Sequence, residues 1–185
     1  MNDDGKNISG MVAQMRKLCA QIALLLRTAN DMMKEKGWEC VSNATADASY
    51  SLSKPRWWIP QYFCQYWTNK DNSGKLSFVS IILDNRDNES SIQIKEPLLM
   101  AGWFDYGPGS EVGDWKSEYC TYHVYMPGRK DDGTPLFADP KKAWPEEKYP
   151  FIRISTFGVP LITVTDTESL KSRIIDPLLK GLEEK

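Results

Sequence analysis

The stretch that decides the fold runs from residue 8 to residue 34 and reads ISGMVAQMRKLCAQIALLLRTANDMMK. Apolar side chains recur in it at the first, fourth and fifth positions of a seven-residue repeat. They are Ile8, Met15, Ile22 and Ala29; Met11, Leu18, Leu25 and Met32; and Val12, Cys19, Leu26 and Met33. Residues at these spacings fall on one side of an α-helix. The sequence therefore predicts one long helix, from about Ser9 to Lys36, with a single broad apolar stripe.

The signals for the end of this helix are equally plain. Lys34 and Lys36 complement the negative end of the helix dipole. Gly37 suits the left-handed position just past a helix, from which Trp38 is expected to fold back on Met33.

Leu24 lies roughly opposite the stripe and allows two interpretations. With Ala20 and Ala23 nearby, residues 20–26 are apolar nearly all round. Either the domain itself covers both sides of the helix there, or the far side of the helix contacts a second copy or a partner protein. An ordinary helix packed on a sheet shows the same stripe as a short coiled coil.

The rest of the chain has the pattern of an antiparallel sheet. In residues 59–67 both alternating sets are apolar, which is typical of a central strand: Tyr62, Cys64 and Tyr66 on one face, and Ile59, Phe63 and Trp67 on the other. A polar turn at 69–74 and a strand at 76–83 complete a hairpin. Further strands are expected at 91–95, 98–106, 118–125, 151–156 and 161–164. Thr165 and Glu168 form the pattern of a capping box that opens a last helix, which Pro177 must kink or split.

Together these elements predict an α+β fold. We expect an antiparallel sheet of about five to six strands, a long N-terminal helix packed across one face and a kinked C-terminal helix. The 185 residues suit a single domain, 1–185, with a disordered tail at 1–7 and a long loop at 127–150. Because the strands are apolar on both sides, that loop, the last helix or a partner is expected to cover the other face.

Composition and motifs exclude several function classes. A net charge of −2 makes nucleic acid an unlikely partner, and the chain contains no apolar run long enough to cross a membrane. The start of the chain is acidic, and Cys19, Cys40, Cys64 and Cys120 form no paired pattern, which favours reduced thiols and the cytoplasm. Phosphate-binding and calcium-binding loops are missing, so we expect no cofactor and no metal.

Catalytic candidates are weak. Asp84, Gln93 and Lys95 loosely resemble the metal-binding set of a nuclease core, although a neutral Gln is a poor ligand and outward-facing strand residues explain the pattern as well. The single histidine, His123, lies three residues after Cys120. On a strand, residues three apart face opposite sides, so these two side chains are not expected to meet as a catalytic pair.

Aromatic residues suggest two kinds of contact. Arg56, Trp57 and Trp58 have the composition of a protein-binding hot spot, although the tryptophans also suit a core. A small-ligand pocket between the sheet and the 127–150 loop would be lined by Trp103, Tyr122 and Trp144.

The sequence thus favours a non-catalytic protein-interaction module that associates with itself through the N-terminal helix, around Leu24, or through the aromatic residues. Its partner is a second copy or another protein. A metal-dependent hydrolase and a small-ligand-binding domain are the alternatives.

Overall fold

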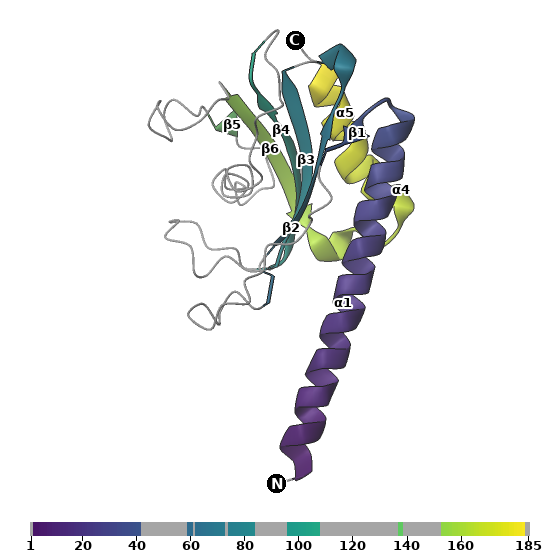
Figure 1. Cartoon of the computed structure of the whole chain (residues 1–185), viewed down its shortest axis with the longest axis vertical. Helices are drawn as coiled ribbons and strands as arrows, with labels where there is room; N and C mark the ends of the chain where they lie inside the picture. Colours follow the sequence, from purple (N-terminus) through teal and green to yellow (C-terminus); the bar gives the residue numbers. More distant parts are fainter. Residues whose placement is uncertain are drawn as a thin grey trace.

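The computed structural model describes residues 2–41, 59–60, 62–72, 74–83, 96–107, 137–138 and 153–183. They form a long N-terminal helix, an antiparallel sheet and a C-terminal helical segment (Figure 1). The predicted α+β class is therefore confirmed. The described strands pair in the order β1-β2-β3-β4-β6-β5, and every neighbouring pair is antiparallel. Their bounds are β1 (Glu39–Cys40), β2 (Tyr62–Thr68), β3 (Lys75–Ile82), β4 (Leu98–Asp105), β5 (Phe137–Ala138) and β6 (Arg153–Pro160).

The hairpin and the two-faced central strand are confirmed. β2 and β3 pair across the turn that contains the short 3-10 helix η2 (Lys70–Asn72). On β2, Phe63 and Trp67 join one buried cluster, whereas Cys64 and Tyr66 join a second cluster on the opposite face. Alternation along an extended strand produces this division, and it explains why both sets are apolar.

The N-terminal helix α1 (Asn2–Glu35) begins well before the expected start near Ser9, so residues 2–7 are helical where a tail was expected. Its end matches the prediction. Gly37 has a φ of 78°, and the Gly37 and Trp38 amides donate to the carbonyls of Lys34 and Met33. This pair of bonds is the Schellman motif, which satisfies the last carbonyls of a helix.

The C-terminal segment packs on the same face of the sheet as α1, because residues of both helices belong to one buried cluster (Figure 1). The expectation that the last helix covers the opposite face of the sheet is therefore wrong. The 127–150 loop, the other cover proposed within the chain, lies outside the described residues apart from β5.

Pro177 splits the last helix, as predicted. α4 (Thr167–Leu170) continues into a π-helical turn, η5 (Lys171–Ile175), and then into α5 (Asp176–Glu183). In a regular α-helix the Pro177 ring would crowd the Arg173 carbonyl. In the π turn the Asp176 amide donates instead to Lys171, five residues back, which widens the helix directly before the proline.

Two local predictions here are wrong. Residues 161–163 are not a strand but a 3-10 turn, η4 (Leu161–Thr163), because β6 continues to Pro160, which pairs with Leu98. The capping box forms one residue later than expected. The Asp166 carboxylate accepts from the Ser169 amide at 2.8 Å, and the Asp166 amide donates to the Ser169 hydroxyl at 3.1 Å.

Candidate functional site

The apolar stripe of α1 changes from buried to exposed along its length. In the C-terminal half, Ile22 is only 4% exposed, and it packs on the sheet with the later members of the stripe. The Trp67 indole N–H anchors this half by donating to Asn30 Oδ1 at 3.0 Å. In the N-terminal half, Ile8 is 62%, Met11 70% and Val12 46% exposed. We call Ile8, Met11, Val12 and the half-buried Met15 the N-terminal stripe.

This exposure follows from the length of the helix. At ~1.5 Å per residue, the 34 residues of α1 span ~50 Å, whereas an eight-residue strand such as β4 spans ~26 Å. The first turns of α1 consequently extend past the end of the sheet (Figure 1). The apolar repeat did not reveal the N-terminal stripe as an exposed surface, because the whole repeat was expected to pack on the sheet. The mismatch of lengths was the signal that could have revealed it.

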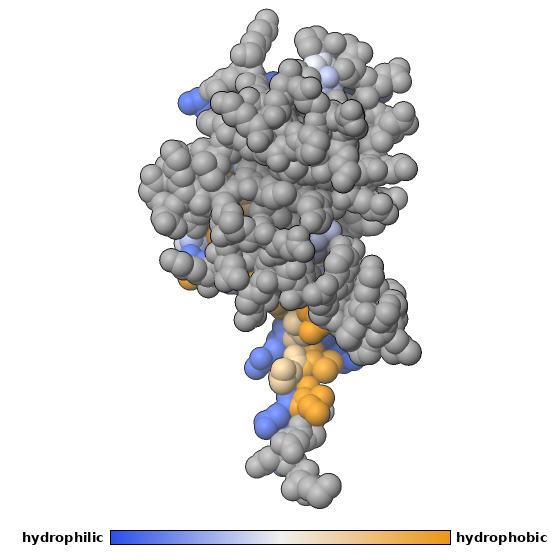
Figure 2. Space-filling model, turned by 90° about the vertical axis from the view of Figure 1, so that its left-hand side faces the viewer, coloured by the Kyte–Doolittle hydropathy of each residue, from blue (hydrophilic) through white to orange (hydrophobic). Residues whose placement is uncertain are grey.

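The N-terminal stripe faces the side of α1 on which the sheet lies. It continues the repeat whose later members are buried against the sheet. Figure 2, which views the molecule from the sheet side of α1, shows apolar side chains on the projecting part of this helix. The stripe therefore lines the inner angle between the projecting helix and the body of the protein.

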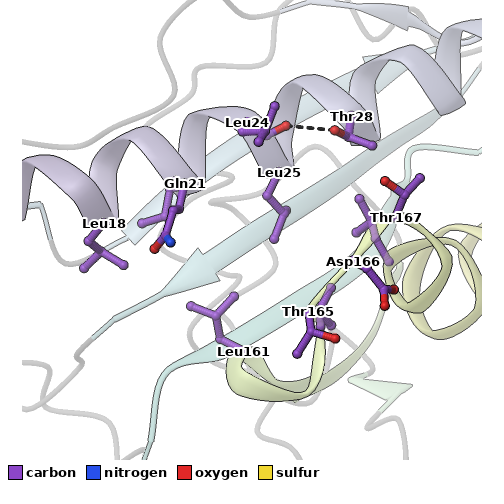
Figure 3. A pocket seen from close by; sticks show the side chains of 12 residues that line it. Leu18, Gln21, Leu24, Leu25, Thr28, Leu161, Thr165, Asp166 and Thr167 are labelled. Carbon is purple, nitrogen blue, oxygen red and sulfur yellow. Dashed lines mark hydrogen bonds between the residues drawn. The ribbon is translucent and has the colours of Figure 1, made fainter.

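A groove opens where α1 leaves the sheet, and it continues the N-terminal stripe. Its cavity volume is about 490 Å³, and it lies between α1 and the chain from η4 to the start of α4. Leu18 and Leu25 of α1 face Leu161 across it, and Asp166 lies on the opposite rim (Figure 3). The groove thus has an apolar floor and a partly polar edge. Hydrogen bonds from Ser169, first from its backbone amide, lower the pKa of Asp166, which keeps this edge anionic.

The projecting segment has a weak intrinsic tendency to be helical. Gly5, Asn7, Ser9 and Gly10 fall within it, and each favours the helix less than alanine does, glycine by ~1 kcal/mol. A Cβ atom added at Gly10 would meet nothing within 4 Å. A helix of this composition, with a bare apolar stripe, gains little from its own contacts.

Of the predicted interaction residues, the structure describes Leu24. Its side chain is 64% exposed and lies at the edge of the groove, where Thr28 donates to the Leu24 carbonyl at 3.0 Å (Figure 3). Exposure is what a contact role for Leu24 requires. Arg56, Trp57 and Trp58 lie outside the described residues, as do the catalytic candidates Asp84, Gln93 and Lys95.

Of the predicted pocket residues, the structure describes Trp103. It is buried in the cluster between the sheet and the helices, and a Cβ atom added at Gly181 would lie 2.5 Å from its ring. The Lys75 ammonium lies 6.0 Å from the ring centroid and donates to the Leu182 carbonyl at the end of α5. Tyr122 and Trp144 lie outside the described residues, so the pocket stays a prediction.

The part of the chain that the structure describes contains few side chains suited to catalysis. No three His, Cys, Asp or Glu side chains gather there as a metal site requires. Cys19 is a half-buried free thiol, Cys64 is a buried one, and Cys40 is exposed. Burial raises the pKa of the Cys64 thiol to about 12, so Cys64 stays protonated and is a poor nucleophile.

This raised pKa predicts a loss of stability in alkali. The unfolded thiol ionises near pH 9, whereas the folded thiol holds its proton until about pH 12. At a pH between these two values, unfolding releases the proton of the Cys64 thiol. The free energy of unfolding therefore falls by up to ~1.4 kcal/mol for each pH unit, because of this one group. Urea unfolding from pH 8 upward checks it, with Cys64→Ala expected to show a shallower decline. Parallel declines for the two proteins would contradict this role of Cys64.

None of the described helices is both long and apolar enough to span a bilayer. Comparison with known protein families, with curated proteins and with solved structures found no match for this chain.

Proposed function

We propose that this protein is a non-catalytic interaction module that associates with a second copy of itself through the N-terminal stripe of α1. The observation that carries this proposal is the exposure of Ile8, Met11 and Val12 on a helix that projects past its own sheet. Aligned apolar side chains of this size on a bare helix are typical of a protein-contact surface.

The residues that flank the stripe favour a second copy as the partner. In paired helices, the fifth and seventh positions of the repeat select the partner by charge. Here they hold Val12 and Cys19, and Asn7, Gln14 and Gln21, all of them uncharged. Two copies of this surface therefore meet without repulsion between like charges at these positions. The positions also carry no charges that a partner with the opposite charges would match. Arg16 and Lys17 lie outside these positions and stay in water.

The position of the stripe argues against a membrane surface as its partner. The stripe lies in the inner angle between the helix and the body. A flat bilayer that reached it would have to pass through the sheet, whereas a second helix fits along it. The free thiols of Cys19 and Cys64 agree with a reducing compartment, and we propose the cytoplasm as the location.

Leu24 provides a second surface, on a different side of α1, and it can be tested in the same experiment. It is the large apolar side chain that α1 exposes outside the stripe, at the edge of the groove. The area that it offers is small, so we place the main contact on the N-terminal stripe.

Sedimentation velocity tests the proposal. The wild-type chain is expected to sediment with twice its 21.1 kDa mass at high micromolar concentration and to dissociate on dilution. The Leu24→Glu variant is expected to behave nearly like the wild type. A wild-type monomer at every concentration would refute self-association. Dissociation caused by Leu24→Glu would move the contact to the other side of the helix.

A further inference from the structure

We infer that the two copies pair antiparallel, with Ile8 of one copy beside Leu18 of the other. This inference rests on the proposed function and adds the orientation and the register of the pair. Both follow from where the stripe faces and from where it stops.

The body of the protein decides the orientation. The stripe and the sheet lie on the same side of α1 (Figure 2). The face that each helix turns to its partner is therefore the face that, farther along the helix, carries its own body. Packed helices lie about 8–10 Å apart. In a parallel pair, both bodies would need the space between two helices at that distance, which is impossible. In an antiparallel pair, each body lies at the N-terminal end of the other helix, beside its first turn.

The ends of the stripe decide the register. In antiparallel helices, a residue at the first position of the repeat packs opposite one at the fourth position. One register places Ile8 opposite Leu18 and Met11 opposite Met15, and the two-fold axis repeats both contacts. A shift of one repeat in one direction would place Asp4 opposite Met15. A shift in the other direction would place Met11 opposite Ile22, so an apolar member of the stripe, and not Asp4, would meet the position that the sheet already covers.

The chosen register also brings the two boundaries of the stripe together. Asp4 holds the repeat position one repeat before Met11, and it is charged. In this register Asp4 of one copy lies opposite Ile22 of the other copy, where that copy's helix begins to be covered by its own sheet. The first turn of each helix therefore reaches the groove of the other copy, near Leu18 and Leu25. The antiparallel helix dipoles add a favourable term.

Cysteine cross-linking tests the orientation. Cys19, Cys40 and Cys120 are replaced by alanine, and Cys64 is kept because its buried thiol is unreactive. The variants Ile8→Cys and Leu18→Cys are prepared in this background, then oxidised alone or after mixing and equilibration. Peptide mass spectrometry counts the disulfides. In the proposed register, the two copies of residue 8 lie ~15 Å apart along the axis, beyond the ~7 Å between Cα atoms that a disulfide can bridge.

The mixture is therefore expected to give at least ~10-fold more of the 8–18 disulfide than either variant gives of its own homodimer. Efficient cross-linking of Ile8→Cys to itself would show a parallel pair and overturn the inference. If sedimentation shows dimers of both variants and neither product forms, the register is wrong while the proposed function stands. A wild-type protein that is monomeric at every concentration would refute both the proposed function and the inferred pairing.

Discussion

Met11→Glu is expected to convert the dimer into a monomer and to reduce the helix content of the chain. Met11 is the most exposed member of the N-terminal stripe, and under two-fold symmetry each dimer contains two copies of its contact. Full burial of such a side chain contributes ~1.5–3 kcal/mol. The loss of two contacts therefore raises the dissociation constant by at least ~100-fold, before the cost of bringing two carboxylates into an apolar contact is added.

The helix content falls because the projecting segment loses the contact that stabilises it. Residues 2–17 contain two glycines, and without a partner they fray from the N-terminus. Sedimentation measures the mass, and circular dichroism at 222 nm measures the helix.

Ala13→Glu is the matched control for this variant. Ala13 is exposed and lies outside the stripe, two residues from Met11, so the substitution adds the same charge to the same segment. The introduced carboxylate is also placed to pair with Lys17 one turn later, which favours the helix. We expect Ala13→Glu to stay dimeric. Equal behaviour of the two variants, whether both dimeric or both monomeric, would show that the stripe is not the contact.

Gly102→Ala is expected to destabilise the fold severely. Gly102 lies in β4, between β3 and β6. A Cβ atom there would overlap the Ser155 carbonyl oxygen and would lie 2.9 Å from the Phe78 ring. The first of these atoms belongs to the backbone of a paired strand, so β4 and β6 must separate to make room. Overpacking of a core costs ~1–3 kcal/mol, and we expect a loss near the top of that range.

Urea unfolding measures this effect, with Gly10→Ala as the comparison. Gly10 lies in the projecting helix, where an added methyl group meets no other atom. That substitution is expected to favour the helix by ~1 kcal/mol. The same chemical change thus has opposite signs at the two sites. A Gly102→Ala variant that unfolds at the wild-type urea concentration would contradict the tight packing of β4 against β6.

The sequence predicted those parts of the fold that depend on local pattern. The apolar repeat predicted the helix, Gly37 predicted its end, and the alternation of Phe63 and Trp67 with Cys64 and Tyr66 predicted a central strand buried on both sides. The split at Pro177 followed from the missing amide of proline. Each of these features is fixed by residues within a few positions of one another.

Features that depend on distant contacts were not predictable in this way. The repeat is the same on both halves of α1, and only the length of the sheet decides that Ile22 is buried and Met11 is exposed. The groove combines Leu25 with Leu161, which are far apart in sequence. The choice of face for the last helix depends on which side of the sheet offers a complementary surface. Leu24, for which the sequence left open a cover from the domain itself or from a partner, is exposed, yet the larger exposed surface lies on the stripe that was expected to be core.

Hydrogen exchange of the α1 amides tests the central claim most directly. Residues 8–18 form the proposed contact, and their amides are protected only while a second copy holds the segment helical. At concentrations above the dimer–monomer transition we expect slow exchange over 8–18, and at concentrations below it we expect fast exchange there, with the protection of Ile22–Met33 unchanged. Exchange over 8–18 that is the same at all concentrations would contradict the account.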